Sequence, residues 1–277
     1  MKVIVADDTG FCFGVQRALQ MIDSKIESQE KIYTLGDVVH NKSVINWLER
    51  RGVKSIQDDI PHDAKNSVLV IRAHGVPKEQ LEQMKKSFKT VVDATCPIVM
   101  SLFKTAEQMN EQGYKIIVFG KRDHPEMVAL IGYVKNAVVT VEPVPLDVKS
   151  CILSQTTMSS EEFHDFVKKS IEISHFKELR IINTICNVTA ERELQARRIA
   201  KESDFVIVLG GKNSSNTCKL VKIAAETTRT VHIEDPSEVD KIDLRDIKTV
   251  GIITGTSTPQ EDVKTLTEKI LNRREKE

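Results

Sequence analysis

Short apolar runs alternate with amphipathic stretches along this chain of 277 residues. Each apolar run is rich in Val, Ile and Leu, as strands buried on both faces of a sheet are. The alternation is typical of an α/β protein with parallel sheets. Strands are predicted at 3–6, 31–35, 68–72, 90–94, 115–120, 137–141, 151–154, 179–184, 205–210, 230–233 and 250–254. Helices are predicted at 14–28, 41–51, 77–87, 97–112, 159–173, 188–202, 215–228 and 259–275.

Three cysteines divide the chain into near-equal thirds, and each is followed by similar residues at the same distances. They lie 84 and 90 residues apart, 91 residues follow the last of them, and they are Cys12, Cys96 and Cys186. Glycine recurs 24 residues after each cysteine, as Gly36, Gly120 and Gly210. A polar residue recurs 28 residues after each, as His40, His124 and Ser214. Glu126 and Asn216 stand two residues further on in the second and third repeats.

This repeat predicts three α/β domains related by a pseudo-threefold axis, each with a small, mainly parallel sheet. The predicted domains are 14–96, 97–185, and 186–277 together with 1–13. Each repeated cysteine is expected just before a helix, and each repeated glycine at the end of a strand. The alternative is an old duplication whose copies share no present function.

The composition excludes several classes of protein. Forty per cent hydrophobic and 29% charged residues are ordinary for a globular protein. Lys and Arg balance Asp and Glu at 40 each, so no basic field attracts nucleic acid or an anionic membrane. No apolar run is long enough to span a membrane, and the first residues are too acidic for a signal peptide. Five widely spread cysteines suggest reduced thiols and a cytoplasmic protein.

The three repeated cysteines suit a metal site assembled from distant parts of the chain. They match neither the close pairs of zinc fingers nor the local runs of ferredoxins. Thiolates favour zinc or an iron–sulfur cluster. With three protein ligands, one iron of a [4Fe–4S] cluster would stay open to bind a substrate as a Lewis acid. Cys151 and Cys218 lie outside the repeat and are predicted to be small buried residues.

Polar loops between strands and helices are the second candidate for chemistry. They are HGVP (74–77), HPE (124–126), SQTT (154–157), KNSSN (212–216) and GTSTP (255–259). Donors beside helix N-termini suit a phosphate or diphosphate, although each loop alone could be an ordinary helix cap. No P-loop motif is present. In one of these loops, Glu126 is a candidate proton donor, the alternative being an acid that complements the helix dipole.

Together these motifs resemble the 4-hydroxy-3-methylbut-2-enyl diphosphate reductase family, which acts last in the non-mevalonate (MEP) pathway of isoprenoid biosynthesis. The matching stretches run from residue 10 to residue 260 and are GFCFGVQRAL, GDVVHNKSV, IRAHGVP, DATCP, GKRDHPE, SQTTMS, LGGKNSSNT and GTSTP. One departure is ICNVTAERE, where the family often has Ile-Cys-Tyr-Ala-Thr and a later Arg-Gln.

The resemblance implies a trefoil of three α/β domains around a [4Fe–4S] cluster. The implied cluster ligands are Cys12, Cys96 and Cys186. The residues implied to bind the substrate diphosphate are His40, His74, Ser214, Asn216 and Ser257, with Ser215 alongside. The residues implied to surround the allylic hydroxyl are His124, Thr156 and Glu126, with Glu126 as the proton source. Thr156 is preferred to Thr157 from its place in the motif.

The implied reaction is a reductive dehydroxylation of (E)-4-hydroxy-3-methylbut-2-enyl diphosphate. Two electrons and two protons remove the hydroxyl as water and give isopentenyl and dimethylallyl diphosphate. A ferredoxin or flavodoxin would supply the electrons, because no Rossmann fingerprint for a nicotinamide or flavin is present. No nucleic-acid or membrane partner is expected. The alternatives are a quinolinate synthase-like enzyme with three cluster cysteines, a non-catalytic iron–sulfur sensor, and a structural zinc protein.

Overall fold

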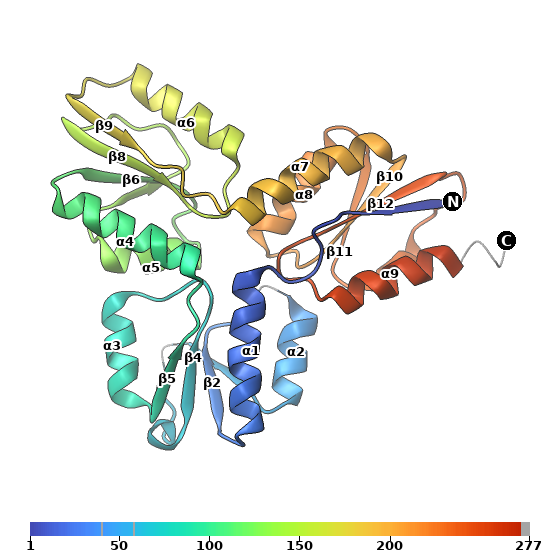
Figure 1. Cartoon of the computed structure of the whole chain (residues 1–277), viewed down its shortest axis with the longest axis horizontal. Coiled ribbons are helices and arrows are strands. Elements are labelled where there is room, and N and C mark those ends of the chain that lie inside the picture. The colour runs from blue at the N-terminus through green and yellow to red at the C-terminus, as the bar shows by residue number, and fades with distance from the viewer. Residues whose placement is uncertain (40, 58, 273–277) are drawn as a thin grey trace. The chain divides into compact units, whose positions relative to one another are not determined.

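The computed structural model describes residues 1–39, 41–57 and 59–272 and contains three four-stranded sheets (Figure 1). Every pair of neighbouring strands in them is parallel. The β10 sheet has the order β1 (Lys2–Val5), β12 (Thr249–Thr254), β10 (Phe205–Leu209), β11 (Arg229–Ile233). The β2 sheet has the order β3 (Lys54–Ile56), β2 (Ile32–Leu35), β4 (Val68–Ile71), β5 (Thr90–Asp93). The β6 sheet has the order β7 (Val138–Thr140), β6 (Lys115–Phe119), β8 (Lys149–Ser154), β9 (Glu178–Ile181).

The helices connect these strands. They are α1 (Phe13–Glu27), α2 (Lys42–Arg50), α3 (Lys78–Ser87), α4 (Pro97–Glu111), α5 (Pro125–Tyr133), α6 (Ser160–Glu172), α7 (Asn187–Glu202), α8 (Ser215–Ala225) and α9 (Gln260–Asn272), with 3₁₀ turns at Ala64–Asn66 and Pro236–Lys241. The predicted class, α/β with small parallel sheets, is therefore confirmed. Every predicted strand and helix is present, with ends shifted by a few residues. Among the described residues, the strand β3, the helix α5 and the two 3₁₀ turns lie outside the predicted ranges.

The three sheets share one strand order. In each, the strand ending at the repeated glycine is an inner strand, and the strand leading to the repeated cysteine is at an edge. Each repeated glycine donates its backbone N–H to the last residue of the next strand, over 2.7 Å from Gly36 to Ile56, 3.0 Å from Gly120 to Thr140 and 2.9 Å from Gly210 to Ile233. The sequence repeat is thus a repeat of backbone structure.

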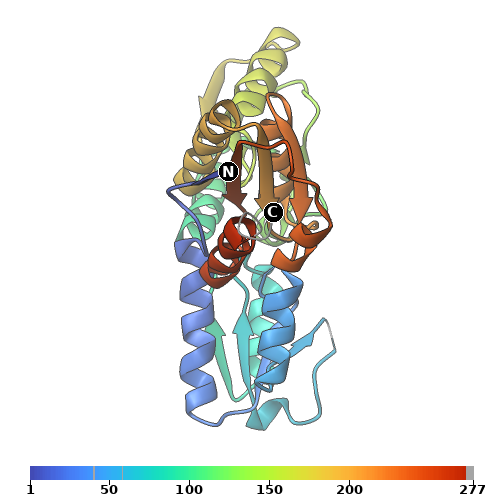
Figure 2. The ribbon, with the colours of Figure 1, turned by 90° about the vertical axis from the view of Figure 1, so that its right-hand side faces the viewer.

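Both faces of the β10 sheet are covered by helices. On one face Phe205, Ile207 and Leu209 pack with α9. On the other face Val206 and Val208 pack with α7 and α8. Figures 1 and 2 show α9 on one side of these strands and the α7–α8 pair on the other. Because alternate residues of a strand point to opposite faces, both sets must be apolar, which explains the continuous run FVIVL.

The β6 sheet is built in the same way, with α4 and α5 on one face and α6 on the other. Ile116 and Val118 of β6 pack among side chains of α4 and α5, whereas Ile117 and Phe119 pack against α6. In the β2 sheet, Leu69 and Ile71 pack with Met84 and Phe88 at the end of α3. These cores fix the carboxyl ends of the strands, where the polar loops begin.

The chain divides into two compact units. Unit 1 is formed by residues 1–16, 39–51 and 187–277, and unit 2 by residues 17–38 and 52–186. Unit 1 contains the β10 sheet, and unit 2 contains the other two sheets. The three predicted domains, 14–96, 97–185, and 186–277 with 1–13, stay a prediction. Among the described residues, no helix is both long and apolar enough to cross a membrane.

Candidate functional site

The three repeated cysteines occupy equivalent backbone positions. Each directly precedes a helix, as predicted, since α1, α4 and α7 begin one residue later. Each also donates its backbone N–H to the residue two places beyond the end of a neighbouring strand. These bonds are 3.0 Å from Cys12 to Thr256, 2.9 Å from Cys96 to Ala73 and 2.9 Å from Cys186 to Thr156. A helix N-terminus stabilises a thiolate, so each position favours metal ligation.

The other two cysteines differ from this set. Cys151 is completely buried in β8, and burial raises the pKa of its thiol to about 11, so it stays protonated. Its predicted role as a small buried residue is confirmed. The same prediction is wrong for Cys218, which is only partly buried and whose thiol donates to the Lys212 carbonyl at 3.0 Å. All five cysteines are described, and none forms a disulfide.

Within unit 2, two histidines follow the carboxyl ends of inner strands, His74 after β4 and His124 after β6. His74 comes one residue after Ala73, whose carbonyl accepts the N–H of Cys96. The rings of His74 and His124 meet edge to face, with 5.5 Å between their centroids. His124 is the N-cap of α5, where its Nδ1 accepts the backbone N–H of Glu126 at 3.2 Å. A neutral His124 ring therefore carries its proton on Nε2.

Glu126 is a buried carboxyl bound on both oxygens by one residue. Its side chain is 1% exposed. Oε1 accepts the backbone N–H of Thr156 at 2.8 Å, and Oε2 accepts its hydroxyl at 2.7 Å. Burial raises the pKa of Glu126 to about 7, although the two hydrogen bonds from Thr156 act in the opposite direction. A carboxyl poised at neutral pH can hold a proton and release it, as a general acid must.

Thr156 connects this carboxyl to the third cysteine. Its carbonyl accepts the N–H of Cys186, while its other polar groups bind Glu126. The hydroxyl of Thr157 instead accepts from the Gln155 amide at 2.8 Å. Hydrogen bonds, one ring contact and chain neighbours thus run continuously from Cys96 through the two histidines to Thr156 and Cys186. Unit 2 therefore brings together six of the predicted site residues, namely Cys96, His74, His124, Glu126, Thr156 and Cys186.

In unit 1, the loop after β10 presents polar groups at the start of α8. Ser214 is the N-cap of α8, and its hydroxyl accepts the backbone N–H of Thr217 at 3.3 Å. Ser215 is the first residue of this helix. The Asn216 side chain is 2% exposed, and neither its Nδ2 nor its Oδ1 has a hydrogen-bond partner among the described residues. A buried amide without partners is costly, so this position indicates a place for a polar ligand.

The loops around Cys12 and Ser257 also meet in unit 1. Cys12 donates its backbone N–H to the carbonyl of Thr256. The carbonyl of the following residue, Ser257, accepts from the side-chain amide of Asn41 at 2.9 Å. Asn41 in turn caps α2, where its Oδ1 accepts from Ser43 and Val44. His40, predicted to bind the diphosphate, lies outside the described residues.

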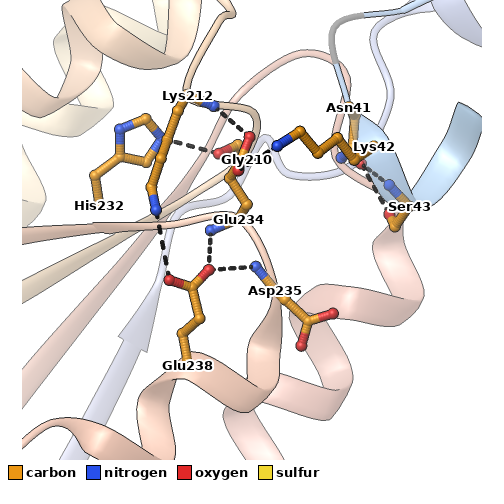
Figure 3. A network of polar contacts seen from close by, with 9 residues as sticks. All are labelled: Asn41, Lys42, Ser43, Gly210, Lys212, His232, Glu234, Asp235 and Glu238. Carbon is orange, nitrogen blue, oxygen red and sulfur yellow. Dashed lines mark hydrogen bonds and ion pairs between the residues drawn. The ribbon is translucent and has the colours of Figure 1, made fainter.

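Acidic residues after β11 hold the loop that contains Lys212. The carboxylate of Glu234 accepts the backbone N–H of Lys212 at 2.8 Å and lies 4.0 Å from the ammonium group of Lys42 on α2 (Figure 3). Glu238 accepts the backbone N–H groups of Glu234 and Asp235 and pairs with the Lys212 ammonium at 3.6 Å. These contacts fix the loop just before Ser214.

Two supporting residues were not predicted from the sequence. Asn41 follows His40, and an Asn before a helix is a recognisable capping signal. Arg192 on α7 is 2% exposed and donates to the carbonyls of Gly10 at 2.8 Å and Thr254 at 3.1 Å, besides its ion pair with Asp8. Arg192 belongs to the departing segment ICNVTAERE, but nothing in that segment shows which loop it holds.

The donor chemistry fits an iron–sulfur cluster at the predicted cysteines. Three reduced, partly accessible thiols each directly precede a helix, whereas Cys151 is buried within β8 and Cys218 lies inside α8. No group of three or more His, Cys, Asp or Glu side chains in the described part of the chain is arranged to hold a single metal ion.

Comparisons with known proteins identify the family. The model of the LytB protein family matches residues 3–271. A 4-hydroxy-3-methylbut-2-enyl diphosphate reductase of Pseudothermotoga lettingae is 57% identical over the whole of both chains. The protein of the same name from Thermotoga maritima is 45% identical over 98% of this chain and 96% of its own.

Two solved structures are similar throughout. One, described as (E)-4-hydroxy-3-methyl-but-2-enyl diphosphate reductase, the terminal enzyme of the non-mevalonate pathway, has a TM-score of 0.72 and 34% identity over 98% of this chain and all of its own. A second reductase structure, from Plasmodium falciparum, has a TM-score of 0.86 over 98% of this chain and 87% of its own; at 24% identity it supports the fold alone. The resemblance noted from the motifs is confirmed, and the chain belongs to the LytB protein family.

Proposed function

We propose that this protein is an iron–sulfur oxidoreductase that converts (E)-4-hydroxy-3-methylbut-2-enyl diphosphate to isopentenyl and dimethylallyl diphosphate. The full-length similarity to named reductases supports this activity. The structural observation that carries it is the buried Glu126–Thr156 pair, because removal of a hydroxyl as water needs a proton donor. The family assignment favours this function over the quinolinate synthase-like, sensor and zinc-protein alternatives.

Cys12, Cys96 and Cys186 would hold a [4Fe–4S] cluster through their thiolates. When bound, such a cluster supplies electrons and an open iron that acts as a Lewis acid. The helix start at each cysteine lowers the cost of the thiolate charge. The fully buried Cys151, with its raised pKa, has no part in this ligand set.

Glu126 would deliver a proton to the leaving hydroxyl oxygen. With a pKa of about 7, a substantial fraction of this carboxyl is protonated at neutral pH. The protonated oxygen can donate to a substrate oxygen while Thr156 continues to bind the other. We place Thr156 and His124 beside the allylic hydroxyl, because both contact Glu126 directly.

The diphosphate would be bound by polar groups of the loops. The residues that we assign to diphosphate binding are His40, His74, Ser214, Ser215, Asn216 and Ser257. The buried, unpartnered amide of Asn216 supports this assignment, since a phosphate oxygen would satisfy its N–H groups. The N-terminus of α8 adds a favourable dipole at the same place. Binding energy from the diphosphate would orient the hydroxyl end for reaction.

We further propose that a reduced ferredoxin or flavodoxin supplies the two electrons and that the reaction takes place in the cytoplasm. The balanced reaction consumes two electrons and two protons and releases one water for each molecule of product.

An anaerobic assay with a reduced viologen dye tests the function directly. The cluster-loaded chain should oxidise the dye only when the hydroxylated allylic diphosphate is added, and chromatography should show both products. Glu126→Gln should keep the visible absorbance of the cluster and reduce turnover at least ~100-fold. Glu162→Gln, an exposed change on α6, serves as the matched control. Absence of turnover in cluster-loaded protein would refute the proposed activity, and near-normal turnover of Glu126→Gln would remove that residue from the mechanism.

A further inference from the structure

A cavity of about 150 Å³ lies in unit 2, close in sequence to the loops that carry His74 and Glu126. Its lining residues are Leu35, Gly36, Gln57, Arg72, Gly75, Val76, Pro77, Gln80, Pro125 and Val128. None of them belongs to the site residues assigned above. One end of α3, the first turn of α5 and the end of β2 all contribute to the wall.

Arg72 is the one charged residue of this lining, and its charge is not neutralised by an ion pair in the described residues. Its guanidinium is largely buried, and the buried Nε has no hydrogen-bond partner there. Burial lowers the pKa of Arg72, while the charge of Asp37 acts against that change. The Asp37 carboxylate is itself bound by the Ser55 hydroxyl at 3.2 Å. An arginine nevertheless keeps its proton at neutral pH.

Gly36 lets the guanidinium lie where it does. A Cβ at this position would stand 2.5 Å from the NH1 nitrogen of Arg72, and the φ angle of +69° is itself one that side chains disfavour. The repeated glycine in this sheet therefore ends a strand and also makes room for a buried cation.

We propose that this cavity binds a small oxyanion of the phosphate class, with Arg72 as its principal donor. A planar guanidinium binds an oxyanion with two parallel hydrogen bonds, and a desolvated one gains most from such a partner. Two polar residues, Gln57 and Gln80, also line the wall. A cavity of ~150 Å³ has room for a benzene-sized guest, so it accommodates one phosphate group and not the allylic diphosphate.

An anion bound here would contact both segments that support the proton donor. Gly75, Val76 and Pro77 directly follow His74, and Pro125 directly precedes Glu126. The rings of His74 and His124 already touch across these segments. Binding of an anion in the cavity should therefore change the surroundings of both histidine rings.

Titration of the full-length, anaerobically prepared chain with inorganic phosphate tests the proposal. Ionic strength is held constant with sodium chloride. Calorimetry should show saturable binding with a Kd of roughly 1 mM. In ¹⁵N-labelled protein, the Nε–H signal of Arg72 should shift with the same affinity, followed by ring signals of His74 and His124.

Two variants and two controls identify the site. Arg72→Gln should weaken the binding at least ~10-fold, as should Gln80→Glu, which keeps the arginine and places a competing carboxylate in the cavity. Arg180→Gln removes a positive charge from β9, which does not line the cavity, and should change affinity by less than ~2-fold. Asn216→Ala removes a group of the assigned diphosphate site in unit 1 and should leave the Arg72 signal shift intact.

Each other outcome overturns the proposal. No saturable binding up to ~20 mM phosphate shows that the cavity takes no such anion. Unchanged affinity in both Arg72→Gln and Gln80→Glu places the phosphate elsewhere. Loss of the Arg72 shift in Asn216→Ala assigns the phosphate to the substrate site. If Arg72→Gln does not fold, Gln80→Glu and the Arg72 signal of the unaltered chain still decide the question.

Discussion

Glu126 shows at the scale of one residue how burial creates chemistry. Its pKa is raised from 4.5 to about 7, so between these pH values the folded chain holds a proton that the unfolded chain has released. The free energy of unfolding decreases as pH rises through this window, because the unfolded state binds fewer protons than the folded state. At higher pH the buried charge costs about 3 kcal/mol relative to the neutral carboxyl.

We therefore predict that Glu126→Gln stabilises the fold above pH 7 and has little effect at pH 5. The amide is neutral at every pH; its oxygen can accept the Thr156 backbone N–H, and its NH2 group can donate to the Thr156 hydroxyl oxygen. Urea unfolding at pH 5 and pH 8 should show a difference that grows with pH, toward about 3 kcal/mol. Glu162→Gln should show no such trend. Parallel curves for Glu126→Gln and the unaltered chain would mean that the carboxyl ionises normally.

The two adjacent threonines provide a second comparison at this scale. Thr156→Val removes the hydroxyl that donates to Glu126, and this bond favours the ionised carboxylate. The pKa of Glu126 should rise further, by about one to two units, and the pH profile of turnover should move to higher pH. Thr157→Val removes a hydroxyl bound to Gln155 and should leave the profile in place. A shift with Thr157→Val alone would reverse the assignment.

Sequence motifs point to individual candidate residues but not to the residues they contact. The motif SQTT marks Thr156, and HPE marks Glu126, but their pairing across 30 residues depends on β6 and β8 being neighbours. The unpaired state of Arg72 and the loop held by Arg192 likewise depend on tertiary packing. Neither leaves a local pattern in the chain.

At the scale of elements, strands buried on both faces were the easiest to predict. Runs such as FVIVL are continuous and apolar because helices cover both sides of the sheet. The strand β3 was missed because KSI is short and only partly buried. The helix α5 had no predicted range, although a helix start was expected at the HPE loop, because PEMVALIGY is apolar almost throughout and lacks a polar face to define a helical period.

Arg192 tests how an element holds a site loop. It connects α7 to Asp8, Gly10 and Thr254, and so fixes the segment leading to Cys12. Arg192→Met leaves two buried carbonyls without these donors and should reduce the free energy of unfolding by about 2–4 kcal/mol. Arg197→Met, on the same helix, alters an exposed pair with Glu226 and should cost less than about 1 kcal/mol. Denaturant midpoints give both values, and equal costs would show that Arg192 has no special role.

For the whole molecule, the repeat in the sequence predicted more than any single motif did. Equal cysteine spacing corresponds to three sheets with the same strand order and the same bonds at each repeated glycine. The repeat grouped residues 1–13 with 186–277, and β1 does lie in the β10 sheet, but the spacing could not show that its neighbour is β12. β1 is an edge strand, and its parallel partner is brought beside it only when the chain folds.

Because the three repeated cysteines occupy equivalent positions in the three sheets, replacing each one should have the same effect. Each sheet leads to one proposed ligand, so Cys12→Ser, Cys96→Ser and Cys186→Ser should lose the cluster to a similar extent. Anaerobic preparations should fall from roughly four irons per chain to less than about one, with loss of visible absorbance. Cys151→Ala and Cys218→Ala should keep both signals, because neither cysteine precedes a helix at a repeated position. If only one or two of the three serine variants lost iron, the sheets would share a backbone plan without sharing the metal.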